Sequence, residues 1–359
     1  MGGHIFVNFS SDDYLDLAAD PRLARAAARA SLRYGCGAGA SHFFSGSLPP
    51  HRALERALAK REGFEAALTF DSTITANLAI LSSLAGPRDA IFCATANSGS
   101  LVDGCFLAGA RTHRYDHKDL SGLDKLLRDR GARAARRLIA TETVFGMDGD
   151  LAPLAEILLL AERYDSLVVL DESHATGVIG DRGRGLTDDL PIGIPGRHRV
   201  IKTGSLSKAY GSQGGFVCGP RNLLDAAAKN SRLVANSSAL AIPAAAAALR
   251  ALALADLETD RRRRALALAE RLRYFLETNG QDPGQSRSQI VSVVVRQPRL
   301  AERISRRLEI LGLLVPAVCP PLVPADTARL RISVTAGHTD ADVDRLVKSL
   351  SEVRAALVV

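Results

Sequence analysis

Two short motifs hold the side chains best suited to chemistry. An apolar run at residues 167–170 ends at Asp171, and His174 follows three residues later. A second apolar run, at 200–203, leads into a segment rich in glycine and serine that contains Lys208. A carboxylate at the end of a buried strand can bind a metal, cap a loop or pair with a protonated heterocyclic nitrogen. A loop lysine is usually a solvated charge, but its amine can also form a Schiff base while neighbouring hydroxyls bind a phosphate.

The occurrence of both motifs in one chain favours the chemical interpretation of each. The first has the form strand-Asp-x-x-His, and the second has the form strand-Ser-x-x-Lys-x-x-Gly, which begins at Ser205. Their joint occurrence favours a Schiff-base lysine at Lys208 over a solvated charge, while the metal, loop-capping and heterocycle interpretations of Asp171 all stay open at this point.

The elements that must position these residues alternate along the chain. Short apolar runs predict strands at 66–70, 90–94, 137–141, 167–170 and 200–203. Helical patterns lie between them at 75–84, 101–108, 120–130 and 151–164. This alternation predicts a mainly parallel sheet with helices on both faces. Ligands bind such sheets outside the carboxyl ends of the strands, where both motifs are expected.

The flanking segments complete the predicted organisation. Capping residues predict helices at 21–34 and 50–62, and a long helical region is expected at about 243–277. A loop at 279–288 then leads to a smaller α+β domain, with strands at 290–295 and 329–334 and helices at 300–311 and 340–357. The expected domains are an N-terminal segment at 1–40, a large domain at 41–245, and a connecting helix with the small domain at 246–359.

Composition narrows the classes of partner. The net charge of +7 arises from 46 basic and 39 acidic residues and weakly favours anionic ligands such as phosphates or coenzyme A. There is no tryptophan and no aromatic interleaving in the basic run 261–264, so we expect no nucleic acid. The apolar stretch 239–255 is interrupted by Pro243 and Arg250, so we expect no membrane span. Five scattered cysteines without a CxxC pair predict no metal site and favour a reducing cytoplasm.

Further motifs, together with these two, are spread over nearly the whole chain. They are NFSSDDYLDLA (8–18), SGSLPPHRALE (45–55), TETVFGMDGDLAPL (141–154), DESHATGVIG (171–180), GSLSKAYGSQGG (204–215) and PPLVPADTARLRISVTAGHT (320–339). With these motifs the chain resembles the α-oxoamine synthases, which condense an amino acid with an acyl thioester. The resemblance implies pyridoxal 5'-phosphate as cofactor and the aspartate-aminotransferase-like α/β fold (fold type I). In that fold a large domain with a mainly parallel seven-stranded sheet is joined to a smaller C-terminal α+β domain.

The resemblance also implies a role for each matching residue. Lys208 would hold the cofactor and move the proton at the α-carbon of the amino acid. Asp171 would keep the ring nitrogen protonated, and His174 would lie near the phenolic oxygen. Arg331 would receive the carboxylate of the amino acid as a two-pronged donor; the alternative is a surface arginine on an edge strand. Further residues implied in the cofactor site are Ser205, Ser72, Thr73, Ile74, Ser98 and Ser238, and Asp12 is implied near the substrate.

Several positions depart from the pattern of the family. Ser98 stands where a histidine usually stacks on the cofactor ring, and the phosphate-binding turn is Ser72-Thr73-Ile74 instead of serine, glycine and an aromatic residue. Gly146 replaces a serine expected near the phenolic oxygen, Asp12 replaces an asparagine, and Cys319 stands where an arginine is common. These changes gather around the expected cofactor and substrate sites.

The substrates implied by the resemblance are L-alanine and a pimeloyl thioester, carried by coenzyme A or a carrier protein, in a decarboxylative step of biotin biosynthesis. Glycine-using members, of the glycine C-acetyltransferase or 5-aminolevulinate synthase type, are an alternative. The departures leave open a second alternative, a catalytically weakened subunit of this fold that mainly binds a partner. The resemblance further implies a homodimer in which Ser238 reaches the phosphate of the neighbouring subunit; a helix-capping role for Ser238 is the alternative.

Overall fold

The chain folds into two compact units, each with its own core. The computed structural model describes residues 5–191 and 193–358. The large unit comprises Leu17–Phe145 and Ala152–Glu258, and the small unit comprises Met1–Asp16, Gly146–Leu151 and Thr259–Val359. These bounds differ from the expected divisions after residues 40 and 245, because segments far apart in the chain complete the small unit. Among the described residues, no helix combines the length and the apolar character needed to cross a membrane.

The large unit is built on a seven-stranded sheet, which confirms the expected fold class. The strand order is β2-β8-β7-β6-β5-β3-β4. In this described sheet β8 alone runs in the direction opposite to the other six strands. The strands are β2 (Ala66–Phe70), β3 (Ala90–Ala94), β4 (Arg111–Tyr115), β5 (Arg137–Glu142), β6 (Ser166–Asp171), β7 (Val200–Ser205) and β8 (Gly215–Gly219). All five predicted strands are present. Two further strands were not expected from the sequence: β4 is a largely polar edge strand, and β8 is a short run between glycines.

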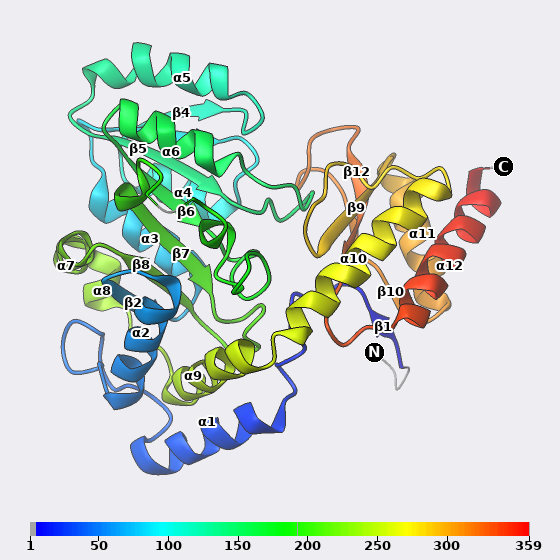
Figure 1. The fold of residues 1–359 in the computed structure, drawn as a ribbon, viewed down its shortest axis with the longest axis horizontal. Helices are drawn as coiled ribbons and strands as arrows, with labels where there is room; N and C mark the ends of the chain where they lie inside the picture. The colour runs from blue at the N-terminus through cyan, green and yellow to red at the C-terminus, as the bar shows by residue number, and fades with distance from the viewer. Residues whose placement is uncertain (1–4, 192, 359) are drawn as a thin grey trace. The chain divides into compact units, whose positions relative to one another are not determined.

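Helices cover both faces of this sheet (Figure 1). On β3, Ile91 and Cys93 pack in one core with α3, α4, α7 and α8, while Ala90, Phe92 and Ala94 pack in a second core with α5 and α6. The helices of this unit are α1 (Pro21–Tyr34), α2 (Pro49–Glu62), α3 (Thr73–Leu84), α4 (Gly99–Leu107), α5 (Leu120–Asp129), α6 (Leu154–Arg163), α7 (Arg221–Asn230), α8 (Arg232–Asn236) and α9 (Ile242–Leu257). Three short 3-10 turns lie at Gly131–Arg133, Leu186–Asp188 and Arg197–Arg199.

Local capping explains where key helices begin and end. The side chain of Asp20 accepts a hydrogen bond from the Arg22 amide, 2.8 Å, and so caps α1 as expected. Helix α2 ends at Gly63, whose φ of 74° is easily adopted only without a side chain. Helix α3 begins two residues earlier than expected because Ser72 caps it by accepting from the Thr75 amide, 3.0 Å. Helix α6 begins three residues later than expected, at Leu154 after Pro153.

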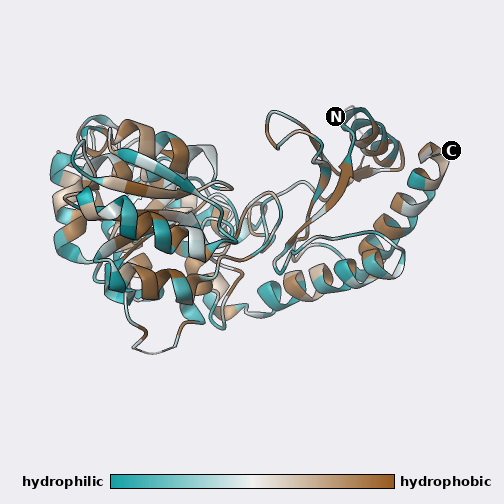
Figure 2. Cartoon of the chain, turned by 90° about the horizontal axis from the view of Figure 1, so that it is seen from above, coloured by the Kyte–Doolittle hydropathy of each residue, from teal (hydrophilic) through white to brown (hydrophobic). Residues whose placement is uncertain are grey.

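The small unit combines two small sheets with three helices. Strand β1 (Val7–Asn8) pairs in parallel with β10 (Leu313–Leu314), and β12 (Ala328–Ser333) lies between β11 (Ala317–Val318) and β9 (Ile290–Arg296). Its helices are α10 (Asp260–Thr278), α11 (Pro298–Ile310) and α12 (Asp340–Val358). The two longest of these helices, α10 and α12, carry both hydrophobic and hydrophilic residues (Figure 2). Their apolar residues join one core with β9 and β12. The long helical region expected at about 243–277 is present as two helices, α9 and α10, separated at Glu258 and Thr259.

Candidate active site

Asp171 is a buried carboxylate side chain at the carboxyl end of β6. The residue is 5% exposed. The Ser173 amide donates to Oδ1 at 2.8 Å, and Asn77 Nδ2 donates to Oδ2 at 2.7 Å. Both of these donors are neutral, and no ion pair to Asp171 is present among the described residues. A buried carboxylate without a cation is costly unless a positively charged group binds it, so this geometry suits a protonated nitrogen of a ligand.

Lys208 lies in the turn that follows the neighbouring strand, β7. The turn is closed by backbone hydrogen bonds from Leu206 to Gly214 and from Gly211 to Lys208, both 2.9 Å. Because β6 and β7 are adjacent and parallel, Asp171 and Lys208 follow the carboxyl ends of two neighbouring strands. His174, half-buried, lies on the turn directly after Asp171. The large unit therefore gathers all three expected catalytic residues at one edge of its sheet.

Hydroxyl groups surround the start of α3 beside the same edge. Thr73 Oγ1 lies 3.4 Å from the carbonyl oxygen of Gly204, the residue before Ser205. Ser205 Oγ is hydrogen-bonded to Ser207 Oγ, 2.9 Å. A Cβ at Gly215 would lie 2.5 Å from both the Ser72 carbonyl oxygen and the Thr73 amide nitrogen, so glycine is required for β8 to approach this helix start. Free amides at a helix N-terminus together with hydroxyls form a favourable phosphate site. The expected residue Ile74 is 59% exposed.

Ser98 is connected to Asp171 through hydrogen bonds. Its amide donates to the carboxylate of Glu142, and Ser98 Oγ is 3.2 Å from Ser100 Oγ. Ser100 Oγ in turn accepts from Asn77 Nδ2, 2.9 Å, and Asn77 contacts Asp171. The serine at the position of the expected stacking histidine therefore belongs to the surroundings of Asp171.

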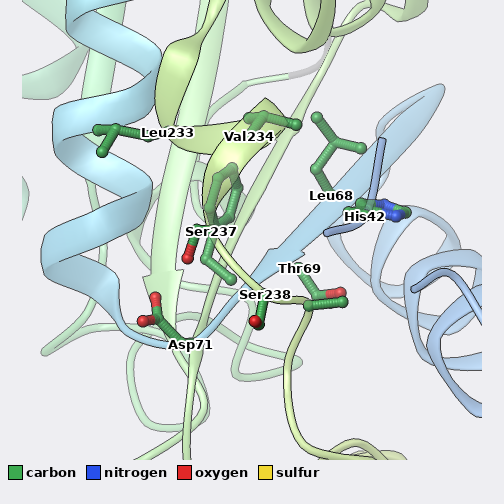
Figure 3. A pocket seen from close by; sticks show the side chains of 10 residues that line it. His42, Leu68, Thr69, Asp71, Leu233, Val234, Ser237 and Ser238 are labelled. Carbon is green, nitrogen blue, oxygen red and sulfur yellow. The ribbon is translucent and has the colours of Figure 1, made fainter. Parts of the chain in front are cut away.

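Ser238 faces a small pocket at the end of β2. Figure 3 shows Ser238 with Ser237, Thr69 and Asp71 around this pocket. The backbone of Ser238 forms an isolated antiparallel bridge with Ser41. Asp71 directly precedes Ser72, so the pocket adjoins the hydroxyl-rich start of α3 along the chain. No capping hydrogen bond from the Ser238 side chain occurs among the described residues.

The small unit brings together the two residues expected to contact the substrate. Arg331 Nη2 forms an ion pair with Asp12 Oδ1, 3.2 Å, while Nε donates to the Gly146 carbonyl, 2.6 Å, and Nη1 to Ser333 Oγ, 2.9 Å. Burial lowers the pKa of this guanidinium, but Tyr14 and Asp12 outweigh that effect and hold the pKa above its ordinary value. Arg331 is therefore a permanent cation, as a carboxylate receptor requires. Cys319 lies in the same unit and is half-buried.

Three residues next to Asp171 were missed from the sequence: Asn77, Ser100 and Thr203. Asn77 is fully buried on α3, and its Oδ1 accepts from Thr203 Oγ1, 2.7 Å. A single amide within the apolar middle of α3, at 76–81, is an observable signal for a buried hydrogen-bonded role. Its partner Asp171 lies 94 residues further along the chain, so only the fold identifies the pair.

A buried ion cluster lies on the other side of the same strands. Lys202 Nζ is 2.6 Å from Glu62 Oε2 and contacts the carboxylate of Glu172, and all three side chains are fully buried. Glu172 Oε2 also accepts from Thr187 Oγ1, 3.0 Å. Burial lowers the pKa of Lys202, but the charges of Glu172 and Glu62 outweigh burial and raise it. Arg61, 3.6 Å from Glu62, donates to the carbonyls of residues 182 and 183. The cluster thereby anchors the loop that follows His174.

Comparison with known proteins agrees with this architecture. Relatives named 8-amino-7-oxononanoate synthase include those of Anaeromyxobacter dehalogenans, 42% identical over 354 residues (98% of this chain and 87% of the relative), and of Azoarcus sp., 42% identical over 357 residues (99% and 90%). Serine palmitoyltransferase of Sphingomonas wittichii superposes with a TM-score of 0.94 at 27% identity, over 99% of this chain and 89% of that one. The synthase structure from Francisella tularensis, at 24% identity and a TM-score of 0.83 over 99% of both chains, shows the same fold.

These similarities extend over both units and confirm the resemblance drawn from the motifs. The sequence also matches the aminotransferase class I and II family over residues 4–350, and the chain belongs to that family.

Proposed function

We propose that this protein is a pyridoxal-phosphate-dependent acyltransferase that condenses L-alanine with a pimeloyl thioester to give 8-amino-7-oxononanoate. The observation that carries the proposal is the buried carboxylate of Asp171, which has neutral donors and stands at the strand edge that also leads to Lys208. The relatives of about 42% identity that bear the name of this synthase support the choice of substrates.

The residues present fit the cofactor. The start of α3, with Ser72, Thr73 and nearby Ser205, would hold the phosphate, and Asp171 would hold the ring nitrogen. Solved relatives, 28% identical and described as serine palmitoyltransferase with pyridoxal phosphate, support the choice of cofactor. When bound, the cofactor supplies an electron-withdrawing ring that stabilises negative charge on the α-carbon of the amino acid.

The side chains of the large unit then divide the proton chemistry. Lys208 would hold the cofactor through its amine, and the same amine would remove the α-proton of the alanine. Asp171 keeps the ring nitrogen protonated, because a carboxylate favours the charged form of a neighbouring base. His174 would lie beside the phenolic oxygen and orient the ring. Ser98 would line the ring face without a stacking imidazole.

In the small unit, Arg331 receives the carboxylate of alanine. The α-carbon forms a bond with the thioester carbonyl carbon, and the thiol leaves. The original carboxylate then leaves as carbon dioxide, and a proton takes its place on the α-carbon. Asp12 already neutralises part of the Arg331 charge, so we expect it to limit how tightly the amino acid is held.

We also propose that the protein acts as a cytoplasmic homodimer in which Ser238 contacts the phosphate bound by the partner. Ser41 forms a backbone bridge with Ser238. Close to Ser41 in the chain, Phe43 is 52% exposed and Phe44 is 72% exposed, and their rings contact each other edge to face. Exposed neighbouring aromatic side chains favour a protein interface over open solvent. All five cysteines are free, as expected in a reducing compartment.

The test begins with cofactor binding. Purified protein should take up pyridoxal phosphate with a visible absorption band, and borohydride should fix the label on Lys208 but leave Lys208→Met unlabelled. Unreduced protein with bound cofactor, mixed with alanine and pimeloyl-CoA, should release one thiol for each 8-amino-7-oxononanoate found by mass spectrometry, whereas the borohydride-reduced protein should be inactive. Glycine and serine in place of alanine test the related activities. A protein that stays colourless, or that binds the cofactor but releases thiol with glycine alone, would contradict the proposal.

A further inference from the structure

We propose that Asn77 is a positioning residue that fixes the carboxylate of Asp171 for the ring nitrogen of the cofactor. The inference rests on the proposed function, because it concerns how the same site holds pyridoxal phosphate. It assigns a role to a residue on α3 that is expected to touch neither the cofactor nor the substrate.

The contacts of Asn77 account for every polar atom of its side chain. Nδ2 donates one hydrogen to Asp171 Oδ2, 2.7 Å, and the other to Ser100 Oγ, 2.9 Å. Oδ1 accepts from Thr203 Oγ1, 2.7 Å. The residue is 0% exposed, so no water competes for these positions. An amide with all its donors and acceptors satisfied can take one orientation only, and that orientation aims a donor at Asp171.

The geometry leaves Asp171 ready for one more partner. Each carboxylate oxygen has one donor, the Ser173 amide on Oδ1 and Asn77 on Oδ2. Each oxygen has room for a second hydrogen bond. The amide of Asn77 thereby fixes Asp171 Oδ2 and the direction in which its remaining lone pair points. A charged, fixed Asp171 is what a protonated ring nitrogen requires.

The orientation of Asn77 depends in turn on two hydroxyls from different elements. Thr203 is paired with Asp171 in register across β6 and β7, and its hydroxyl fixes which end of the amide faces Asp171. Ser100, near the start of α4, holds the second amide hydrogen and is itself 3.2 Å from Ser98 Oγ. Asn77 therefore links three elements around one carboxylate, and changes at Thr203 should act on the cofactor through Asn77.

The test compares variants of similar volume. We expect Asn77→Leu, which removes the donor, to weaken the binding of pyridoxal phosphate about 10- to 100-fold, as expected for loss of a hydrogen bond to a charged group. Asn77→Asp keeps an acceptor for Thr203 but sets a second carboxylate against Asp171, so that one of the two must bind a proton. It should lose at least as much affinity and shift the absorption of the bound cofactor. Thr203→Val should weaken binding less, about threefold to tenfold.

Leu127→Ala is the matched control, because Leu127 is buried in the core with α5 and α6, away from α3. It should lower stability yet leave cofactor affinity and absorption unchanged at a temperature at which every variant is folded. Normal affinity and absorption in Asn77→Asp and Asn77→Leu would overturn the positioning role, provided that wild type binds pyridoxal phosphate on Lys208. A wild-type protein that binds no cofactor would instead refute the proposed function, which keeps the two failures distinct.

Discussion

Two neighbouring carboxylates, Asp171 and Glu172, lie on opposite sides of the same strand end and have opposite surroundings. Asp171 has neutral hydrogen-bond donors, from Asn77 and from the Ser173 amide. Glu172 contacts the ammonium group of Lys202 and the hydroxyl of Thr187. On β7 the adjacent residues repeat this division, because Thr203 contacts Asn77 while Lys202 contacts Glu172. Successive side chains of extended backbone point to opposite faces.

The difference separates a binding site from a structural one. In the Lys202 cluster, buried positive and negative charges neutralise each other within the protein. Around Asp171 the protein fixes the position of the negative charge but supplies no cation among the described residues. Asp171 can therefore stay available for a cationic ligand, although the neighbouring Glu172 is paired with Lys202 inside the protein.

The largest effect on stability is expected for Lys202→Met. It would leave Glu62 and Glu172 buried without the ammonium between them, and loss of one member of a buried ion pair costs about 3–5 kcal/mol. Urea unfolding followed by circular dichroism measures this change in the free energy of unfolding. The double variant Glu172→Gln/Lys202→Met should regain part of the loss, because one of the stranded charges is removed. A loss below about 1 kcal/mol in the single variant would show that the cluster does not act as a closed ionic unit.

A smaller, pH-dependent effect is expected at Glu55, another buried carboxylate of the large unit. Burial raises its pKa to about 7, although the Thr69 amide and hydroxyl, 3.0 and 2.9 Å away, act to lower it. The folded state therefore binds a proton more tightly than the unfolded state, whose ordinary pKa is 4.5. The stabilising contribution is complete below pH 4.5 and is lost as pH rises to about 7, by roughly 1.4 kcal/mol per pKa unit.

Glu55→Gln should remove that dependence. The measurement is the free energy of unfolding of wild type minus that of the variant, from pH 4.5 to 8. His42 lies 2.8 Å from Glu55, and burial lowers its pKa, which gives stability the opposite slope as pH falls. Because His42 contacts Glu55, the two proteins are compared in a His42→Asn background, which removes this contribution from both. If this difference in the free energy of unfolding did not change with pH, the hydrogen bonds from Thr69 would be sufficient to keep Glu55 charged in the folded protein.

The sequence alone predicted that Asp171 and Lys208 lie at the ends of strands. It did not predict which distant side chains contact Asp171 and Lys202. Asp171 and Lys208 were found because each follows an apolar run, and the mainly parallel sheet places both runs at one edge. Asn77 could not be assigned to Asp171, because the contact depends on how α3 packs across the sheet. Lys202 lies inside a run expected to be a buried strand, yet its partner Glu62 is 140 residues away. Long-range pairing of polar side chains is decided by the fold rather than by local pattern.

The smallest effect on stability is expected for Asp171→Asn, although its effect on function should be large. The asparagine has nearly the same shape and can still accept the Ser173 amide, but its NH2 group then faces the Asn77 donor, so the cofactor-free protein should lose about 1–3 kcal/mol of stability. Cofactor affinity should fall at least tenfold, because a neutral amide cannot favour a protonated ring nitrogen. Urea unfolding of the cofactor-free proteins and titration with pyridoxal phosphate measure the two quantities separately. If Asp171→Asn destabilised the cofactor-free fold as strongly as Lys202→Met, Asp171 would be a structural charge like Glu172. The contrast between the two sides of the strand would then be lost.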